Sequence, residues 1–177
     1  MEKKPSALLI GLGYGTLTAL AGVVFSLILF VTELDQTQSW MQNLTYLITL
    51  GGILLAQITY KNKYNNGFIT YGEAFKIGLL TSLFMAIITS IYLFIFFRYI
   101  DPGSMDLIMQ KAEQQMLDQG KTDLEIEQGM KFMQMVNNAG WYTFFGFLGT
   151  FFGGIVISLI TSIFVKKEDM SFNQPTY

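Results

Sequence analysis

Few side chains of this sequence could do chemistry, because it contains neither Cys nor His. It therefore offers no thiol nucleophile, no cysteine-bound metal and no histidine base. Glu33 and Asp35 could form an acid–base pair or hold a metal, but at the end of an apolar run they are expected to be hydrated only. Glu73 is the better candidate for a functional charge, although Lys76 lies one helical turn away and an ion pair between the two is expected. We predict a protein that is not an enzyme and has no catalytic residue, metal site or cofactor.

A glycine-rich segment, Gly11-Leu12-Gly13-Tyr14-Gly15, superficially resembles a dinucleotide-binding loop. It lacks the G-x-G-x-x-G spacing, no strand precedes it, and it lies within an apolar run. Close packing of helices explains it better. A nucleic-acid partner is not expected either, because the net charge is −2 and phosphate binding requires a concentrated basic surface.

The elements that position these residues follow from the apolar runs. Hydrophobic residues make up 51% of the sequence and charged residues 14%, against roughly 25% charged in a soluble domain. A helix needs about 20 apolar residues to cross a bilayer, and four uncharged stretches are long enough. We predict a single all-α membrane domain over residues 1–177, built as a bundle of four transmembrane helices. The expected helices are residues 7–31, 41–60, 74–97 and 142–165, with a helical outer loop at 98–141 and a tail at 166–177.

The first predicted helix has an alternative interpretation as a cleavable signal peptide. Lys3 and Lys4 precede its apolar run, and Ala19-Leu20-Ala21 resembles a cleavage site. The run continues ten residues beyond Ala21, which is longer than the apolar region of a signal peptide. This length favours an uncleaved transmembrane helix.

The distribution of Lys and Arg predicts the orientation of the four helices. One side of the membrane receives seven lysines: Lys3, Lys4, Lys61, Lys63, Lys76, Lys166 and Lys167. The other side has Arg98 and three lysines, all in the long loop, whereas the short first loop has none. Since basic residues concentrate on the cytoplasmic side, both termini are expected in the cytoplasm. Trp40 and Trp141, both at predicted outer helix ends, agree with this orientation.

Small and polar residues recur at helical spacing in all four predicted helices. Such rows let helices approach closely and form hydrogen bonds in lipid. The residues assigned to these packing seams are Gly11, Gly15, Gly22, Thr49, Gly52, Gly78, Ser82, Ser90, Gly146, Thr150, Gly154 and Ser158. A compact bundle is the simpler interpretation, because Ser and Thr in membrane helices usually bond to a neighbouring carbonyl or across an interface. The alternative is that these rows line a polar path.

The long outer loop is predicted to form two amphipathic helices, which could cap the bundle or lie on the outer leaflet. The first starts at Asp101-Pro102 and ends at Gly120, and the second opens with Thr122 and Glu125 as a capping box. Five methionines on their apolar sides form a candidate partner face: Met105, Met109, Met116, Met130 and Met133. Packing of these methionines against their own protein is the simpler alternative. The acidic balance of the loop makes adhesion to anionic headgroups less favourable.

The segment Asn-Gly-Phe-Ile-Thr-Tyr-Gly-Glu-Ala-Phe-Lys-Ile-Gly at residues 66–78 resembles a signature of the bacterial domain-of-unknown-function family 4199. In that family such a stretch opens the third of four spans, which ends in aromatic residues and Asp-Pro, similar to Phe96, Phe97, Arg98, Tyr99, Ile100, Asp101 and Pro102 here. With a Met- and Gln-rich outer loop and a Gly-rich last helix, the resemblance covers essentially the whole chain. It implies the inner membrane of Gram-negative bacteria and genes beside a membrane glycosyltransferase acting on lipid-linked sugars. It transfers no functional residue.

The cores of the predicted spans contain no Asp, Glu, Lys, Arg or His, whereas proton- and ion-coupled transporters place ionisable groups there. The three prolines also lie outside the spans, so no broken helix is indicated. We therefore expect a non-catalytic accessory subunit in the lipid bilayer that binds another inner-membrane protein, such as that glycosyltransferase, or a second copy of itself. The alternative is a small transporter or lipid-binding protein that uses the Ser and Thr rows and Glu73.

Overall fold

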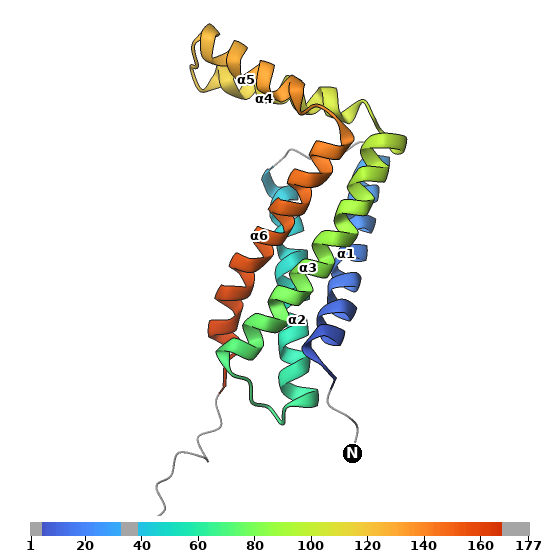
Figure 1. The fold of residues 1–177 in the computed structure, drawn as a ribbon, viewed down its shortest axis with the longest axis vertical. Coiled ribbons are helices and arrows are strands. Elements are labelled where there is room, and N and C mark those ends of the chain that lie inside the picture. Colours follow the sequence, from blue (N-terminus) through green and yellow to red (C-terminus); the bar gives the residue numbers. More distant parts are fainter. Residues whose placement is uncertain (1–4, 33–38, 168–177) are drawn as a thin grey trace, which may run out of the picture. The chain divides into compact units, whose positions relative to one another are not determined.

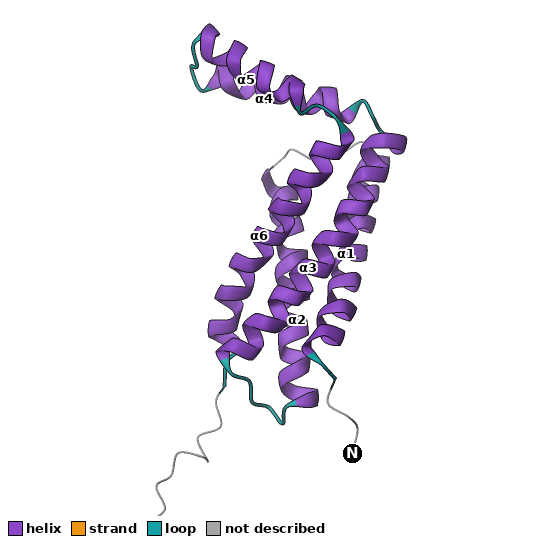
Figure 2. Ribbon diagram, viewed as in Figure 1, coloured by secondary structure: helices purple, strands orange, loops and turns teal. Residues whose placement is uncertain are grey.

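The computed structural model describes residues 5–32 and 39–167, with the backbone alone for residues 39–42. The described chain is helical almost throughout and contains no β-strand, as Figures 1 and 2 show. Its helices are α1 (Ala7–Val31), α2 (Ser39–Thr59), α3 (Tyr71–Ile95), α4 (Ser104–Asp118), α5 (Asp123–Met135) and α6 (Ala139–Val165), with π-helical turns at Tyr60–Tyr64 and Phe96–Ile100. The predicted all-α fold is confirmed.

Four helices are long and apolar enough to cross a membrane, as predicted from the apolar runs. These candidate spans are Ala7–Val31, Asn43–Tyr64, Tyr71–Ile100 and Ala139–Val165. The helices α3 and α6 each begin three residues before the predicted position, and both early starts have local causes. The Thr70 hydroxyl accepts a hydrogen bond from the Glu73 N–H (3.2 Å), and the Asn138 side chain accepts one from the Trp141 N–H (3.1 Å). Such caps satisfy backbone donors that the first helical turn leaves free.

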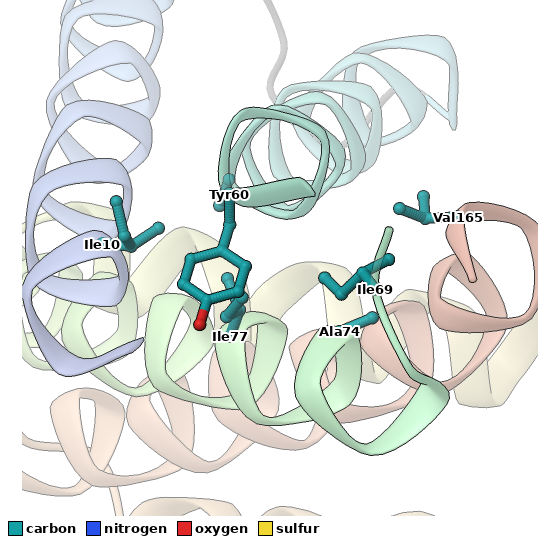
Figure 3. Close-up of a cluster of buried hydrophobic side chains, with 7 residues drawn as sticks. Ile10, Tyr60, Ile69, Ala74, Ile77 and Val165 are labelled. Atoms are coloured by element: carbon teal, nitrogen blue, oxygen red, sulfur yellow. The ribbon is translucent and has the colours of Figure 1, made fainter. Parts of the chain in front are cut away.

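The chain divides into two compact units, Met1–Thr89 with Gly149–Tyr177, and Ser90–Leu148. In the first unit, α1, α2 and the adjoining parts of α3 and α6 lie side by side (Figure 1). A buried cluster closes the end of this unit where α2 turns into α3, as Figure 3 shows. Its members are Ile10, Ala56, Tyr60, Ile69, Ala74, Ile77 and Val165. The sides of these helices that face away from the bundle carry exposed apolar side chains, such as Leu17 and Ile163, as contact with lipid requires.

The second unit contains the end of α3, the hairpin of α4 and α5, and the start of α6. Helix α4 begins at Ser104, two residues after the predicted Pro102, so the predicted N-cap at Asp101 was wrong and Gly103 holds that position. The Asp101 carboxylate still accepts a hydrogen bond from the Ser104 N–H at 3.2 Å. Gly120, with φ of +70°, follows the end of α4 as predicted.

Thr122 and Glu125 form the predicted capping box at the start of α5. The Thr122 N–H donates to the Glu125 carboxylate at 2.9 Å. Hydrogen bonds from the backbone and side chain of Thr122, together with the nearby Lys121 ammonium, hold the pKa of Glu125 below its ordinary value. The ionised form of this carboxylate therefore fixes the first turn of the helix.

Candidate functional site

Gln57 joins three helices inside the first unit. Its side chain is completely buried. The amide Nε2 donates to the Ala74 carbonyl of α3 and to the Ser162 hydroxyl of α6, at 3.1 Å each. The Ser162 hydroxyl donates in turn to the Ser158 carbonyl at 2.6 Å. Gln57 was not among the predicted seam residues, although a lone amide within an apolar run is the kind of residue that bonds membrane helices to one another.

Helices α3 and α6 fit together through glycine and serine residues spaced four apart on both. A Cβ atom added at Gly78 would collide with the Ser158 side chain, and one added at Gly154 would collide with the Ser82 side chain. Ser158 also donates to the Phe75 carbonyl of α3 at 3.2 Å. Each helix therefore offers the space that the other fills, and the structure brings four predicted seam residues into one contact.

Helix α1 crosses α3 at two glycines of the sequence segment that resembled a dinucleotide loop. A Cβ atom at Gly11 would lie 2.5 Å from the Leu80 Cβ, and one at Gly15 would lie 2.6 Å from the Thr81 carbonyl oxygen. Because backbone atoms cannot move aside as side chains can, alanine does not fit at Gly15 without displacing α1. The segment is a helix-packing surface.

Of the other predicted seam residues, some contact a neighbouring helix and others do not. A Cβ atom at Gly52 would collide with the Thr18 side chain, and one at Gly146 would lie 2.5 Å from the Leu93 Cδ1. At Gly22, by contrast, a Cβ atom would meet nothing within 4 Å. Three predicted residues, Thr49, Ser90 and Thr150, are half-buried. The Thr49 hydroxyl donates to the Thr45 carbonyl within its own helix at 3.2 Å.

Six buried residues of the bundle use their hydroxyl groups to donate to backbone carbonyls, whereas the buried Thr143 hydroxyl and the Gln57 Oε1 have no hydrogen-bond partner among the described residues. The buried polar residues of the described chain are Thr18, Gln57, Thr81, Ser82, Ser158, Thr161 and Ser162, and none of them is ionisable. Each of their six hydroxyls donates to a carbonyl oxygen at 2.6–3.2 Å. Each of these hydroxyls has therefore already committed its single proton inside the bundle and cannot donate it to a passing solute without first breaking that bond.

The segment 66–78, singled out by its resemblance, forms the turn between α2 and α3 and the first turns of α3. Asn66 and Gly67 have φ of +51° and +83°, a conformation that Asn and Gly tolerate best. Ile69 is 1% exposed and pairs its backbone with Lys167 through two hydrogen bonds of 2.9 Å. The same segment supplies Ala74 to the Gln57 amide and Gly78 to Ser158. The residues of this segment therefore form the turn and the helix contacts that close one end of the bundle.

Glu73, the candidate functional charge, caps α3. Its carboxylate accepts hydrogen bonds from the Thr70 N–H (3.0 Å) and the Thr70 hydroxyl (3.1 Å). Among the described residues no ion pair joins Glu73 to Lys76, so the expected pair was wrong. The capping box prevails because Thr-x-x-Glu places the carboxylate next to free backbone donors at the start of the helix.

Five lysines surround this turn and form what we call the lysine-rich end: Lys61, Lys63, Lys76, Lys166 and Lys167. The Lys61 ammonium donates to the Val165 carbonyl in the last turn of α6 at 2.9 Å. The Lys167 ammonium lies 5.5 Å from the centre of the Phe68 ring, within the range of a cation–π contact. Lys63, Lys76 and Lys166 are exposed.

Replacing Lys61 with methionine is expected to lower the free energy of unfolding by about 1 kcal/mol, because a half-buried cation at a helix C-terminus is lost. Lys63→Met is the matched control: it removes the same charge two residues away, from an exposed position. Unfolding in mixed micelles at increasing SDS fraction measures both. Equal losses in the two variants would show that the bond to Val165 does not contribute.

The five methionines of the predicted partner face are half-buried. Met116 packs closely on Gly129 of α5, where a Cβ atom would lie 2.8 Å from the Met116 Cε. Helix α5 also buries Ile126 on this side. The large apolar side chains left exposed on α5 are instead Leu124, Phe132 and Met135, and no pattern in the sequence singled out Leu124 and Phe132.

Several predicted residues lie outside the described part of the chain. These are Lys3, Lys4, Glu33, Asp35 and the side chain of Trp40. Within the described part, no group of three or more acidic residues could hold a metal ion.

Comparison with known proteins places the chain in a family. Residues 13–167 match the family model described as "Protein of unknown function (DUF4199)". No curated protein and no solved structure matches the chain. The matched residues include the turn at 66–78, the hairpin of α4 and α5, and nearly all of the four candidate spans. This integral membrane protein therefore belongs to the DUF4199 family, as the signature at residues 66–78 predicted.

Proposed function

We propose that this protein is a non-catalytic subunit of a bacterial inner-membrane complex. It binds its partner through the face of α5 that carries Leu124, Phe132 and Met135, which we call the outer face of α5 because it points away from the hairpin. The observation that carries the proposal is a set of exposed apolar side chains outside the candidate spans. Leu124, Phe132 and Met135 are 64%, 57% and 72% exposed. Large apolar groups gathered on one face mark a protein or membrane contact rather than a surface that faces water.

Their spacing places these three side chains on one side of the helix. Positions 124, 128, 132 and 135 share one face of the helix, and Ile126, which is buried in the hairpin, lies on the opposite face. Helix α5 thus has one apolar face that its own hairpin covers and an outer face, with Leu124, Phe132 and Met135 around Gln128, that the described chain leaves open.

The charges of α5 favour a protein over a lipid surface as the occupant of this outer face. The helix carries Asp123, Glu125 and Glu127 against a single cation, Lys131. Helices that lie on anionic membranes are usually basic, because each Lys or Arg gains attraction from the headgroups. An acidic helix with exposed Leu and Phe fits a hydrophobic groove of a partner protein better.

The bonded interior supports a scaffold rather than a transporter, which remains the second candidate. Ser82, Ser158 and Ser162 of the seams donate to carbonyls and Glu73 caps a helix, so these residues, on which the alternative depends, already have structural partners. The partner to test first is a membrane glycosyltransferase of lipid-linked sugar assembly, the class that the sequence resemblance implies.

Purification from native membranes in a mild detergent, followed by quantitative mass spectrometry, tests the proposal. The wild-type protein is expected to carry one membrane protein in fixed stoichiometry, and Leu124→Asn with Phe132→Asn to reduce that protein at least about tenfold, as loss of central apolar contacts does. Gln128→Asn, on the same face, is the control. A lone monomer from wild-type membranes, or equal recovery from both variants, would contradict the proposal.

We also propose that the lysine-rich end and both termini face the cytoplasm, because basic residues concentrate at that end. Reporters fused to the C-terminus and inserted near Gly120 are expected on opposite sides of the membrane. A periplasmic C-terminus would overturn this orientation.

A further inference from the structure

The lysine-rich end has the charge and position of a site for lipid headgroups. Its five lysines lie at the adjoining ends of three candidate spans: the end of Asn43–Tyr64, the start of Tyr71–Ile100 and the end of Ala139–Val165. Side chains at such positions reach the headgroup level of a leaflet, and long lysine side chains extend their ammonium groups toward it.

Contacts between distant parts of the sequence hold these lysines together. The Lys61 ammonium bonds to the Val165 carbonyl at 2.9 Å, next to Lys166 and Lys167 in the chain. The backbone of Lys167 pairs with Ile69, and the buried side chains of Ile69 and Val165 belong to the same cluster (Figure 3). The ammonium groups therefore project from a fixed frame.

Their positive charge is not balanced by ion pairs within the described chain. The Glu73 carboxylate, which lies at this end, accepts its hydrogen bonds from the Thr70 N–H and hydroxyl and pairs with no lysine of the described chain. The ion pairs Lys121–Glu125 and Lys131–Glu127 lie in the hairpin of α4 and α5 and not at this end. Glu168 and Asp169 follow Lys167 in the sequence, outside the described residues. Among the described residues of this end, five lysines against Glu73 leave a net positive surface that attracts anions.

Apolar surface lies next to the ammonium groups along α6. Ile160, Ile163 and Phe164 are 51%, 56% and 80% exposed, within two turns of Lys166. Cations beside an exposed apolar strip match a ligand with a phosphate head and acyl chains. We propose that the lysine-rich end binds the phosphate of an anionic phospholipid whose acyl chains lie along this strip of α6.

Lipid titration of the delipidated full-length protein by native mass spectrometry tests this site. The probes are phosphatidylglycerol and phosphatidylcholine with the same acyl chains. We expect phosphatidylglycerol to bind wild type at least about tenfold more tightly, and Lys63→Gln with Lys166→Gln to remove most of that preference. Both lysines are exposed, so the double variant should fold, which unfolding in mixed micelles checks.

Lys111→Gln with Lys131→Gln is the matched control, because it removes two exposed charges from the hairpin of the other unit. This variant should keep the lipid preference. Equal binding of the two lipids to wild type, or an equal loss in both double variants, would overturn the site. Displacement of the lipid by millimolar inorganic phosphate would assign the site to free phosphate and also overturn the proposal. Since the partner surface lies on α5, the lipid site and the proposed function can fail independently.

Discussion

Gly15→Ala is expected to lower the free energy of unfolding by about 1–3 kcal/mol, the range found when atoms are forced into a packed interface. The added methyl group would lie 2.6 Å from the Thr81 carbonyl oxygen, 2.9 Å from the Phe84 Cβ and 3.1 Å from the Met85 nitrogen. Two of these three atoms belong to the backbone of α3. The strain can be relieved only by moving α1 away, which also weakens its contact at Gly11.

Gly13→Ala is the control on the same helix, because a Cβ atom there meets nothing within 4 Å. Alanine favours helix over glycine, so this change should be neutral or stabilise by up to about 1 kcal/mol. Gly22→Ala should behave like the control. Unfolding at increasing SDS fraction measures all three variants. A loss at Gly13 equal to that at Gly15 would contradict the described crossing of α1 and α3.

Gly78→Ala is expected to lower the free energy of unfolding by a similar amount. A second substitution, Ser158→Gly, should partly restore that free energy. The added Cβ would collide with the Ser158 side chain and lie 3.0 Å from the Gln57 Nε2, which threatens the bonds from that amide to α3 and α6. Removing the Ser158 side chain clears the space but also loses its bond to the Phe75 carbonyl.

A double-mutant cycle separates these effects, because contacting residues couple by about 0.5–3 kcal/mol whereas distant ones add. The loss in the double variant should be clearly smaller than the sum of the two single losses. Gly52→Ala combined with Ser158→Gly is the comparison, since the Cβ atom added at Gly52 would meet Thr18 of α1 and not Ser158. Strict additivity for Gly78 and Ser158 would mean that the two residues do not oppose each other.

The helices were predictable because their signals are local. The length of an apolar run decides whether a helix can cross a membrane, and the capping box at Thr122 and the glycine at Gly120 lie next to the ends that they determine. The largest error in a helix start, three residues for α3 and α6, arose from overlooked caps at Thr70 and Asn138.

The contacts between helices were less predictable, because spacing shows that small residues share a face but not what that face meets. Gly22 continues a row on α1 yet meets no neighbour within 4 Å, whereas Gly15 contacts the backbone of α3. For the same reason the methionines of the hairpin looked available from sequence, although Met116 packs on Gly129. The exposed face of α5 became apparent only once its covered face was known.

Several distinctive residues of the turn at residues 66–78 have a structural role. Asn66 and Gly67 provide the positive φ angles, Glu73 caps α3, and Gly78 accommodates Ser158. A sequence signature of this kind identifies the family by its architecture. Function has to be sought on surfaces that the architecture leaves open.

Site-specific photocrosslinking in living cells tests the central claim, that the outer face of α5 binds a partner protein, most directly. A photoreactive phenylalanine analogue at Leu124, Phe132 or Met135 is predicted to crosslink one and the same membrane protein. At Ile126, which is 9% exposed on the covered face, it should give no such product. Crosslinks to lipid alone at the three exposed positions, or the same protein product from position 126, would contradict the account.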